Sequence, residues 1–253
     1  MISFGIDELI IQNPAWKSKR IGLVTNDAAT TNTGILSRTA LVQAGFTIVC
    51  LFTPEHGISA KAPDGEAQQN SMDTITGLPI ISLYGNKCMP TAQDLENIDL
   101  LLFDIPDIGA RFYTYLWTLT YVLEACALHH KELIVLDRPN PVPGNLDAAE
   151  GPFLEESSSS FIGRWNIPIK HSCTLGELAL YFNNTKNIDA SLTVVPVKNW
   201  DRDDLATDWG TNFVATSPAI QSLNSMLLYP GLCLLEATNI SEGRGSQYSF
   251  ETA

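Results

Sequence analysis

The sequence lacks the motifs that would place it in several large enzyme classes. No Gly-x-Gly-x-x-Gly follows its first predicted strand, where the chain reads TNDAATTNTG from Thr25, so a nucleotide-binding site of the Rossmann type is disfavoured. No Gly-x-Ser-x-Gly turn is present, which argues against a serine nucleophile of that kind. The five cysteines are scattered without a C-x-x-C pair and the four histidines are dispersed. We therefore expect small buried thiols, no metal site and no cofactor.

Basic charge and long apolar runs are also scarce. The chain has 15 basic and 28 acidic residues, a net charge of −13, whereas binding to a phosphate backbone needs clustered Lys and Arg. We therefore expect no nucleic acid partner. The opening MISFGIDELI has no basic region before a long apolar segment, and no run of about 18 apolar residues occurs. These absences predict no membrane partner and a cytoplasmic location, or a periplasmic or secreted one if the chain is processed.

The pattern that is present alternates short apolar strands with helical segments. Such alternation predicts right-handed crossovers and a parallel sheet. The fold class is therefore expected to be α/β, with a Rossmann-like parallel sheet domain over residues 1–148. The predicted strands are residues 20–26, 46–52, 78–84, 100–103 and 133–137, and the predicted helices are residues 31–44, 90–97 and a segment ending near residue 129.

A serine-rich segment at residues 155–160 marks the expected seam with the second part of the chain, residues 149–253. This part is expected to be a smaller and incomplete α+β domain. In chain order, we expect a helix to about residue 183 opened by the capping box of Thr174 and Glu177, a strand at 191–197, a helix from Ser217 to Pro230, and a buried strand at 232–238.

Polar side chains that can carry chemistry follow every predicted strand. In an open parallel sheet the strand exits meet at one edge, so residues far apart in sequence can converge on one crevice. The alternative is that polar residues simply collect in loops, but turns usually favour Asn, Ser and Gly, whereas Glu, His, Asp, Arg and Tyr recur here. The exit residues are Asn26, Glu55, His56, Tyr84, Asp104, Asp107, Arg111, Asp137, Arg138 and Asn140.

Glu55 and His56 form the most distinctive pair. A glutamate that follows an apolar strand and a proline can be partly desolvated, which favours its protonated form and suits it to general acid catalysis. The two residues could instead be a helix-capping carboxylate beside a structural histidine.

Two arginines and two tyrosines near the exits have open roles. Arg111 and Arg138 could clamp a substrate carboxylate in bidentate fashion, or could pair with a neighbouring aspartate and brace the loops. Tyr113 and Tyr115 lie two residues apart and would face different sides of a helix, so at most one of them is expected to meet a ligand.

The chain resembles the DUF1343 or YbbC-like family, whose characterised members are exo-β-N-acetylmuramidases of the NamZ type. The resemblance runs essentially end to end and rests on many blocks in one order. These are GID at Gly5, IGLVTN at Ile21, PEHG at Pro54, GE at Gly65, SLYG at Ser82, FDI-DIGARFYTY at Phe103, LDRPNP at Leu136, EGP at Glu150, TLGELA at Thr174, LTVVPV at Leu192, YPG-CLLEATN at Tyr229 and SEGRG at Ser241.

The resemblance implies a cleft between two domains that releases β-linked N-acetylmuramic acid from the non-reducing end of peptidoglycan fragments or muropeptides. It implies a catalytic carboxylate at Glu55 with His56 beside it. A second carboxylate, Asp107 or Glu242, could be the nucleophile or base, or the 2-acetamido oxygen of the substrate could attack. The candidate catalytic residues are thus Glu55, His56 and Asp107, and the candidate substrate-binding residues are Asn26, Tyr84, Arg111, Tyr113, Arg138, Asn140, Asn239, Glu242 and Arg244.

Three departures from the family pattern favour an alternative function. The chain has HSCT at His171 where relatives usually have HGLT, and SPAI at Ser217 where they have an SPNMP-like segment. Relatives also continue for on the order of a hundred further residues, the size of a domain. The alternative is a non-catalytic muropeptide-binding or structural remnant. Whichever function holds, residues beyond about 239 are expected to be mobile in the isolated chain or ordered only by contact with another copy, so a homo-oligomer is among the expected partners.

Overall fold

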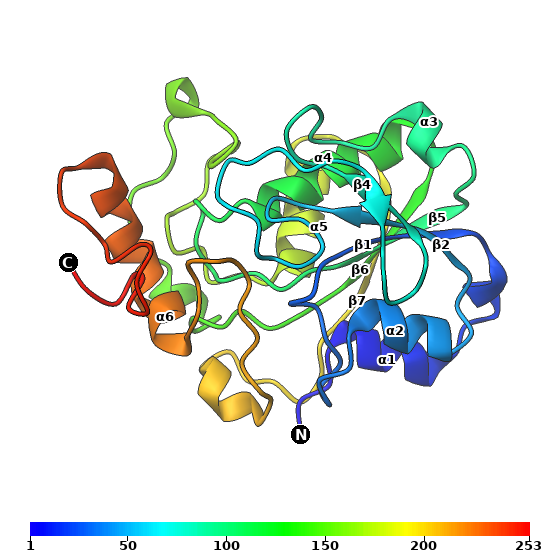
Figure 1. Ribbon diagram of the computed structural model, residues 1–253, viewed down its shortest axis with the longest axis horizontal. Helices are drawn as coiled ribbons and strands as arrows, with labels where there is room; N and C mark the ends of the chain where they lie inside the picture. Colours follow the sequence, from blue (N-terminus) through cyan, green and yellow to red (C-terminus); the bar gives the residue numbers. More distant parts are fainter.

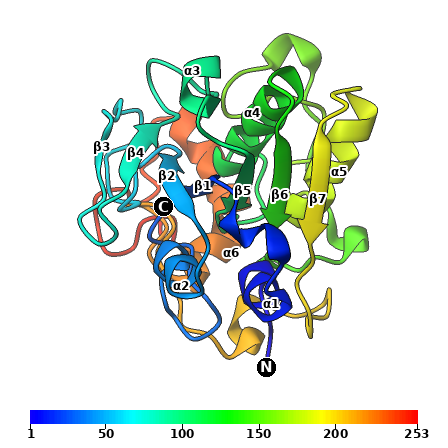
Figure 2. The ribbon, with the colours of Figure 1, turned by 90° about the vertical axis from the view of Figure 1, so that its right-hand side faces the viewer.

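The computed structural model describes residues 1–253 and contains one seven-stranded sheet with the strand order β3-β4-β2-β1-β5-β6-β7 (Figure 2). All neighbouring strands are parallel except β3, which pairs antiparallel with β4 at one edge. The α/β fold class expected from the sequence is confirmed. The strands are β1 (Ile21–Thr25), β2 (Ile48–Thr53), β3 (Ser71–Met72), β4 (Pro79–Ser82), β5 (Leu100–Asp104), β6 (Glu132–Leu136) and β7 (Ser191–Val195).

The central strands are apolar along their whole length because both faces of the sheet are covered. Every residue of β1 and β5 is buried, and the two strands pair in register from Ile21 opposite Leu100 to Thr25 opposite Asp104. Continuous apolar runs of this kind are typical of parallel sheets between two helix layers.

Helices cover the two faces of the sheet as separate layers (Figure 2). On one face, α1 (Gly5–Gln12) and α2 (Ser37–Gln43) contribute Ile6, Leu9 and Leu41 to a core with Leu23 and Leu102. The other face is covered by α3 (Ala92–Leu95), α4 (Tyr115–Leu128) and α5 (Leu175–Thr185). The shorter 3-10 helices are η1 (Ala15–Ser18), η2 (Leu146–Ala148), η3 (Glu156–Ser158), η4 (Ala206–Trp209) and η5 (Cys233–Ala237).

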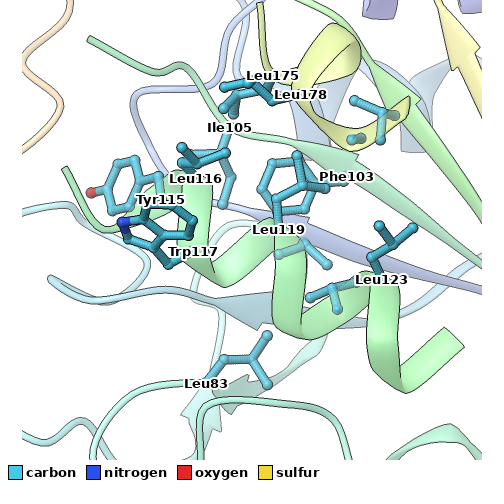
Figure 3. Packing of buried hydrophobic residues seen from close by; sticks show 14 of the residues in the cluster. Leu83, Phe103, Ile105, Tyr115, Leu116, Trp117, Leu119, Leu123, Leu175 and Leu178 are labelled. Atoms are coloured by element: carbon cyan, nitrogen blue, oxygen red, sulfur yellow. The ribbon is translucent and has the colours of Figure 1, made fainter. Parts of the chain in front are cut away.

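The helix α4 is the centre of the larger core. Its residues Leu116, Trp117, Leu119 and Leu123 are fully buried; Leu116, Leu119 and Leu123 lie on the side of Phe103 of β5 (Figure 3), and the Trp117 ring lies 6.1 Å from that of Phe182 of α5. Because α4 is apolar on nearly all sides, it is covered by other elements rather than lying on the surface. Burial of four such side chains stabilises the fold by about 1.5 to 3 kcal/mol each.

The sheet extends beyond the boundary expected at residues 148 and 149. The strand β7 pairs with β6 over five residues, from Glu132 opposite Ser191 to Leu136 opposite Val195, and α5 packs against α4. The expectation that the sheet ends before residue 149 is therefore corrected. A parallel pair needs a crossover connection of about a dozen residues or more, and the chain between β6 and β7 is longer than that, so β7 can reach the free edge of β6.

Two elements of the last third differ from expectation. The helix α6 (Leu223–Leu232) begins after Ser222, whose Oγ accepts a hydrogen bond from the Ser225 amide at 3.0 Å, and it contains Pro230 near its end. Residues 232–238 do not form a buried strand, because most of them lie in η5 and Leu234 is 51% exposed. A short apolar run does not distinguish a strand from a helical turn. The helix α6, η5 and the C-terminus lie at the end of the molecule away from α3 (Figure 1). No helix has the length and apolar character needed to cross a membrane.

Candidate active site

A cavity of about 310 Å³ lies at the exit of β2, between the sheet and the C-terminal segment. We call it the Glu55 cavity. It is bounded on one side by residues that follow β2 and residues that precede α4, and on the other by residues of α6 and the chain beyond it. Its lining residues include Glu55, His56, Asp64, Tyr113, Thr114, Ser217, Tyr229, Glu236, Arg244 and Phe250.

Glu55 is held by two hydrogen-bond donors, one on each carboxylate oxygen. Thr114, the residue before α4, donates its hydroxyl to Oε2 at 2.8 Å, and the backbone amide of Gly65 donates to Oε1 at 3.1 Å. The side chain is 8% exposed, so it is desolvated and still borders the cavity. Burial and the nearby Glu55 carboxylate raise the pKa of the Tyr84 phenol to about 12. Tyr84 lies near Glu55 but does not line the Glu55 cavity.

His56 points into the loop of residues 60–66 that carries Gly65. Its Nδ1 lies 2.8 Å from the carbonyl oxygen of Ala62, which can only accept, so Nδ1 carries the hydrogen. Its Nε2 lies 3.7 Å from Oδ1 of Asp64. The backbone of His56 is left-handed, with φ of 69°, a conformation uncommon for residues other than glycine. His56 thus braces the loop that holds Glu55.

Of the two tyrosines before and at the start of α4, only Tyr113 lines the Glu55 cavity. Its hydroxyl has no hydrogen-bond partner in the structure, and burial raises its pKa. Tyr115 instead donates its hydroxyl to the carbonyl of Thr216 at 2.6 Å and is fully buried. A buried hydroxyl without a partner is costly unless water or a ligand satisfies it. Tyr113 is therefore a candidate contact for a polar group in the cavity.

Arg244 and Glu242 reach the site from the C-terminal segment. The Arg244 guanidinium forms ion pairs with three carboxylates, through Nε to Glu242 at 2.9 Å, through Nη2 to Glu236 at 2.9 Å, and through Nη1 to Asp64. Arg244 lines the cavity, whereas Glu242 is 6% exposed and is not among the lining residues.

Asp107 lies on a different, smaller cavity of about 80 Å³ that follows β5 and β6 and also borders Arg138 and Trp209. Its Oδ2 accepts from the Gly109 amide at 3.0 Å and lies 3.2 Å from Nε2 of His171, while its Oδ1 has no partner. Asp107 does not line the Glu55 cavity.

The two arginines that could clamp a substrate carboxylate or brace the loops are engaged within the protein. Arg138 binds Asp104 with Nε at 2.6 Å and Nη2 at 3.1 Å. Arg111 donates Nη1 to the carbonyls of Pro152 at 2.8 Å and Ile167 at 2.6 Å. Burial lowers the pKa of Arg111, which has no carboxylate partner in the structure. The structure therefore favours the bracing alternative for Arg138, and the Arg111 contacts fix the loop after residue 149.

The remaining candidates lie outside the Glu55 cavity. Asn26 is fully buried at the exit of β1, with its Nδ2 unpartnered, and Asn239 is exposed. Asn140 donates to the carbonyl of Cys173 at 3.0 Å. A Cβ on Gly109, whose φ is 79°, would lie 2.4 Å from Oδ1 of Asn140, so this contact requires glycine at position 109. Asn140 thus connects loops rather than lining the cavity.

Sequence reasoning missed several residues that shape the site. Thr114 holds Glu55, Asp64 and Glu236 line the cavity, and His171 orients Asp107. Thr114 lies inside an aromatic run and resembles an ordinary residue preceding a helix. Asp64 lies in a long polar stretch without any pattern that identifies a contact partner. In the sequence, His171 is marked only by its place in a departure from the family motif.

The fold and the site define an α/β protein whose carboxylate-bearing cavity lies between a parallel sheet and a C-terminal segment. Two family models match the chain, one described as exo-β-N-acetylmuramidase NamZ, N-terminal, over residues 21–224, and one described as its C-terminal counterpart, over residues 227–253. The chain therefore belongs to the NamZ family, and the resemblance seen in the sequence is confirmed. Glu55 and Tyr113 fall within the first model, whereas Tyr229, Glu236 and Arg244 fall within the second.

Relatives and solved structures match nearly the whole chain. It is 44% identical over 253 residues to the peptidoglycan β-N-acetylmuramidase NamZ of Bacillus subtilis (strain 168), with 99% of this chain and 60% of that protein covered. The crystal structures of two DUF1343 family proteins from Bacteroides fragilis are similar. One has a TM-score of 0.89 at 37% identity, covering 98% of this chain and 64% of that one; the other has 0.83 at 32%, covering 99% and 66%. The chain thus spans about three fifths of the length of the Bacillus relative.

Proposed function

We propose that this chain carries the catalytic site of an exo-acting β-N-acetylmuramidase that removes N-acetylmuramic acid from the non-reducing end of peptidoglycan fragments. The observation that carries the proposal is the placement of Glu55. It is buried, it is fixed at both oxygens, and it borders a cavity whose two walls come from the two matched parts of the NamZ family. The name of the Bacillus relative supports the substrate class.

Glu55 serves as the general acid. The Gly65 amide can only donate, so Oε1 must remain an acceptor, and a proton held by Glu55 resides on Oε2. The Thr114 hydroxyl at Oε2 can rotate and accept that hydrogen. Glu55 then gives the proton to the glycosidic oxygen as the bond from this oxygen to the anomeric carbon breaks.

The 2-acetamido oxygen of the substrate is the nucleophile we favour. Asp64 and Glu236, the other carboxylates that line the cavity, are both paired with Arg244. Asp107 borders the other cavity. Attack by the acetamido oxygen forms a bond to the anomeric carbon. This bond closes a five-membered ring that contains the acetamido group. Water then attacks the anomeric carbon, which opens that ring, and loses its proton to the Glu55 carboxylate, as in the substrate-assisted glycosidases.

Hydrolysis of paired chromogenic substrates tests the proposal. The purified chain should release the chromophore from a β-N-acetylmuraminide and release it far more slowly from the matched β-N-acetylglucosaminide, which lacks the lactyl carboxylate. Binding of muropeptide without release would support the alternative of a non-catalytic muropeptide-binding protein. If the chain neither binds muropeptide nor releases the chromophore, the assignment is wrong.

We also propose that the chain can associate with further copies of itself. Sedimentation velocity over a range of protein concentrations would measure it directly. A single species with the mass of one chain, 27.7 kDa, at all concentrations would exclude the oligomer.

A further inference from the structure

The loop of residues 60–66, which we call the Glu55 loop, is held from two sides. From the sheet side, the His56 ring donates to the Ala62 carbonyl at 2.8 Å. From the C-terminal side, Arg244 forms its ion pair with Asp64. Next to the first anchor and including the second, the Glu66 amide donates to the Pro63 carbonyl at 3.2 Å, which closes a β-turn of residues 63–66 with Gly65 at its third position. Gly65 has a φ of 74°, the positive value that a type II turn requires there.

This turn determines where the Gly65 amide points. Asp64 and Gly65 are neighbours in the turn, so a displacement of the Asp64 side chain anchor displaces the Gly65 peptide as well. The Gly65 amide is the only donor to Oε1 of Glu55 in the structure. Gly65 itself is exposed, so nothing but its turn and its hydrogen bond keeps the amide in place.

Arg244 is suited to be an anchor because its own position is fixed. Glu242 and Glu236 hold Nε and Nη2, and the guanidinium lies 5.3 Å from the centre of the Phe250 ring. One nitrogen is thereby left for Asp64. A planar guanidinium held at two positions presents the third in a defined direction, which a lysine ammonium does not.

We propose that Arg244 is a positioning residue that, through its ion pair with Asp64, keeps the Gly65 amide on Oε1 of Glu55. This inference rests on the proposed role of Glu55 as the general acid. The amide restricts the proton to Oε2, the oxygen beside Thr114. Without the hydrogen bond from the Gly65 amide, the Glu55 carboxyl group can be protonated on either oxygen and can rotate away from the glycosidic oxygen. The C-terminal segment thereby controls the geometry of an acid located more than 180 residues earlier in the sequence.

Amide hydrogen exchange of Gly65 in the full 253-residue chain tests the contact without any substrate. Glu55→Ala removes the acceptor and provides the reference rate of an unprotected Gly65 amide. Arg244→Ala should accelerate the exchange by about tenfold or more, toward this reference. Arg20→Ala is the matched control, since Arg20 also pairs with an aspartate, Asp99 at 2.7 Å, but precedes β1 at the opposite end of the strands. It should leave Gly65 exchange unchanged.

Turnover of the chromogenic muraminide tests the consequence. Arg244→Ala and Asp64→Ala should each lower kcat by about tenfold with a smaller change in KM, because the loss affects the alignment of the acid. The double variant should be no worse than either single one, because both substitutions remove the same interaction. Arg244→Lys retains a cation near Asp64 and should recover part of the loss.

The two readouts separate this inference from the proposed function. Unchanged Gly65 exchange in a folded Arg244→Ala protein would overturn the inference, whatever the turnover. Independent, multiplying effects of Arg244→Ala and Asp64→Ala on kcat would also overturn it. Absence of turnover in the parent protein would overturn the proposed function instead, and the exchange rates would still decide whether Arg244 holds the Gly65 contact.

Discussion

The two ends of β5 carry the same kind of ion pair in opposite surroundings. Before the strand, Asp99 pairs with Arg20, and the two side chains are 37% and 50% exposed. At its last residue, Asp104 pairs with Arg138, and the corresponding values are 0% and 8%. Arg138 also donates to the Thr30 carbonyl at 2.7 Å and lies over the Phe4 ring. Breaking the buried pair is therefore expected to cost more stability than breaking the exposed pair.

The amino ends and the carboxyl ends of the strands also differ in their buried polar groups. Buried polar atoms without a partner occur at the carboxyl ends of the strands, on Asn26, Thr53, Asp107 and Tyr113. None belongs to a residue directly before a strand. Unsatisfied buried polar groups are expensive and usually indicate waters, ligands or a functional site. The buried polar atoms without a partner therefore gather at the carboxyl ends of the strands, where the Glu55 cavity also lies.

The largest expected effect is on stability at the buried end. Arg138→Ala should lower the free energy of unfolding by about 3 to 5 kcal/mol, because Asp104 would remain buried without its counter-charge. Arg20→Ala should have a far smaller effect on the free energy of unfolding, because its pair is exposed to solvent. Urea unfolding of both variants measures the contrast. Equal losses would show that burial does not distinguish the two pairs.

The next effect is on catalysis at the exit of β2. Glu55→Gln keeps the shape of the side chain and removes the titratable proton, so turnover should fall by about a hundredfold or more. The chromogenic muraminide assay measures this, with thermal unfolding as the check on folding. Near-normal turnover in a folded Glu55→Gln protein would remove Glu55 from the mechanism.

A smaller effect is expected at the second cavity. Asp107→Asn weakens the acceptor for the Gly109 amide and for His171, and should cost about 1 to 3 kcal/mol of stability. Turnover should fall by less than about tenfold, because Asp107 does not border the Glu55 cavity. A loss of turnover as large as that of Glu55→Gln would instead identify Asp107 as the second catalytic carboxylate.

The smallest effect concerns acid stability at the exposed end. Hydrogen bonds from Arg20 lower the pKa of Asp99 from 3.8 to about 2. Since the folded-state pKa is below the unfolded one, the pair stabilises the fold above about pH 4, and this contribution is lost as the pH falls through about 2. The stability difference between the parent and Arg20→Ala should therefore shrink over this range. A difference independent of pH, measured by urea unfolding, would contradict the prediction.

Much of the sheet could be predicted because its strands are continuous apolar runs followed by polar exits. The expected strand at residues 100–103 and the observed β5 (Leu100–Asp104) differ by one residue. The sequence predicts the seventh strand in another domain, because a serine-rich seam separates it from β6 and sequence does not reveal pairing across such a distance. A short apolar run at residues 232–238 was wrongly expected to be a strand.

The site was predictable only in part, since a strand exit identifies a residue type and not the cavity that it faces. Glu55 follows β2 and Asp107 follows β5, and nothing in their sequence context indicates that they border different cavities. Likewise the sequence left two partners open for Arg138, and only the packing of Asp104 beside it distinguishes them. The partners of Arg244 depend on contacts between segments far apart in the chain.

The late position of β7 in the chain has a consequence for folding. Leu136, the last residue of β6, and Ser191, the first of β7, are separated by a connection of more than fifty residues. Closing so long a loop carries an entropy cost that precedes any gain from strand pairing, which slows this step relative to the β1–β2 and β5–β6 pairings, whose connections are shorter. During synthesis, the edge of β6 is therefore free until residues 191–195 leave the ribosome. In that interval, β6 of one chain can pair with β6 of another, and rapid translation of the segment that follows it would protect the nascent protein from aggregation.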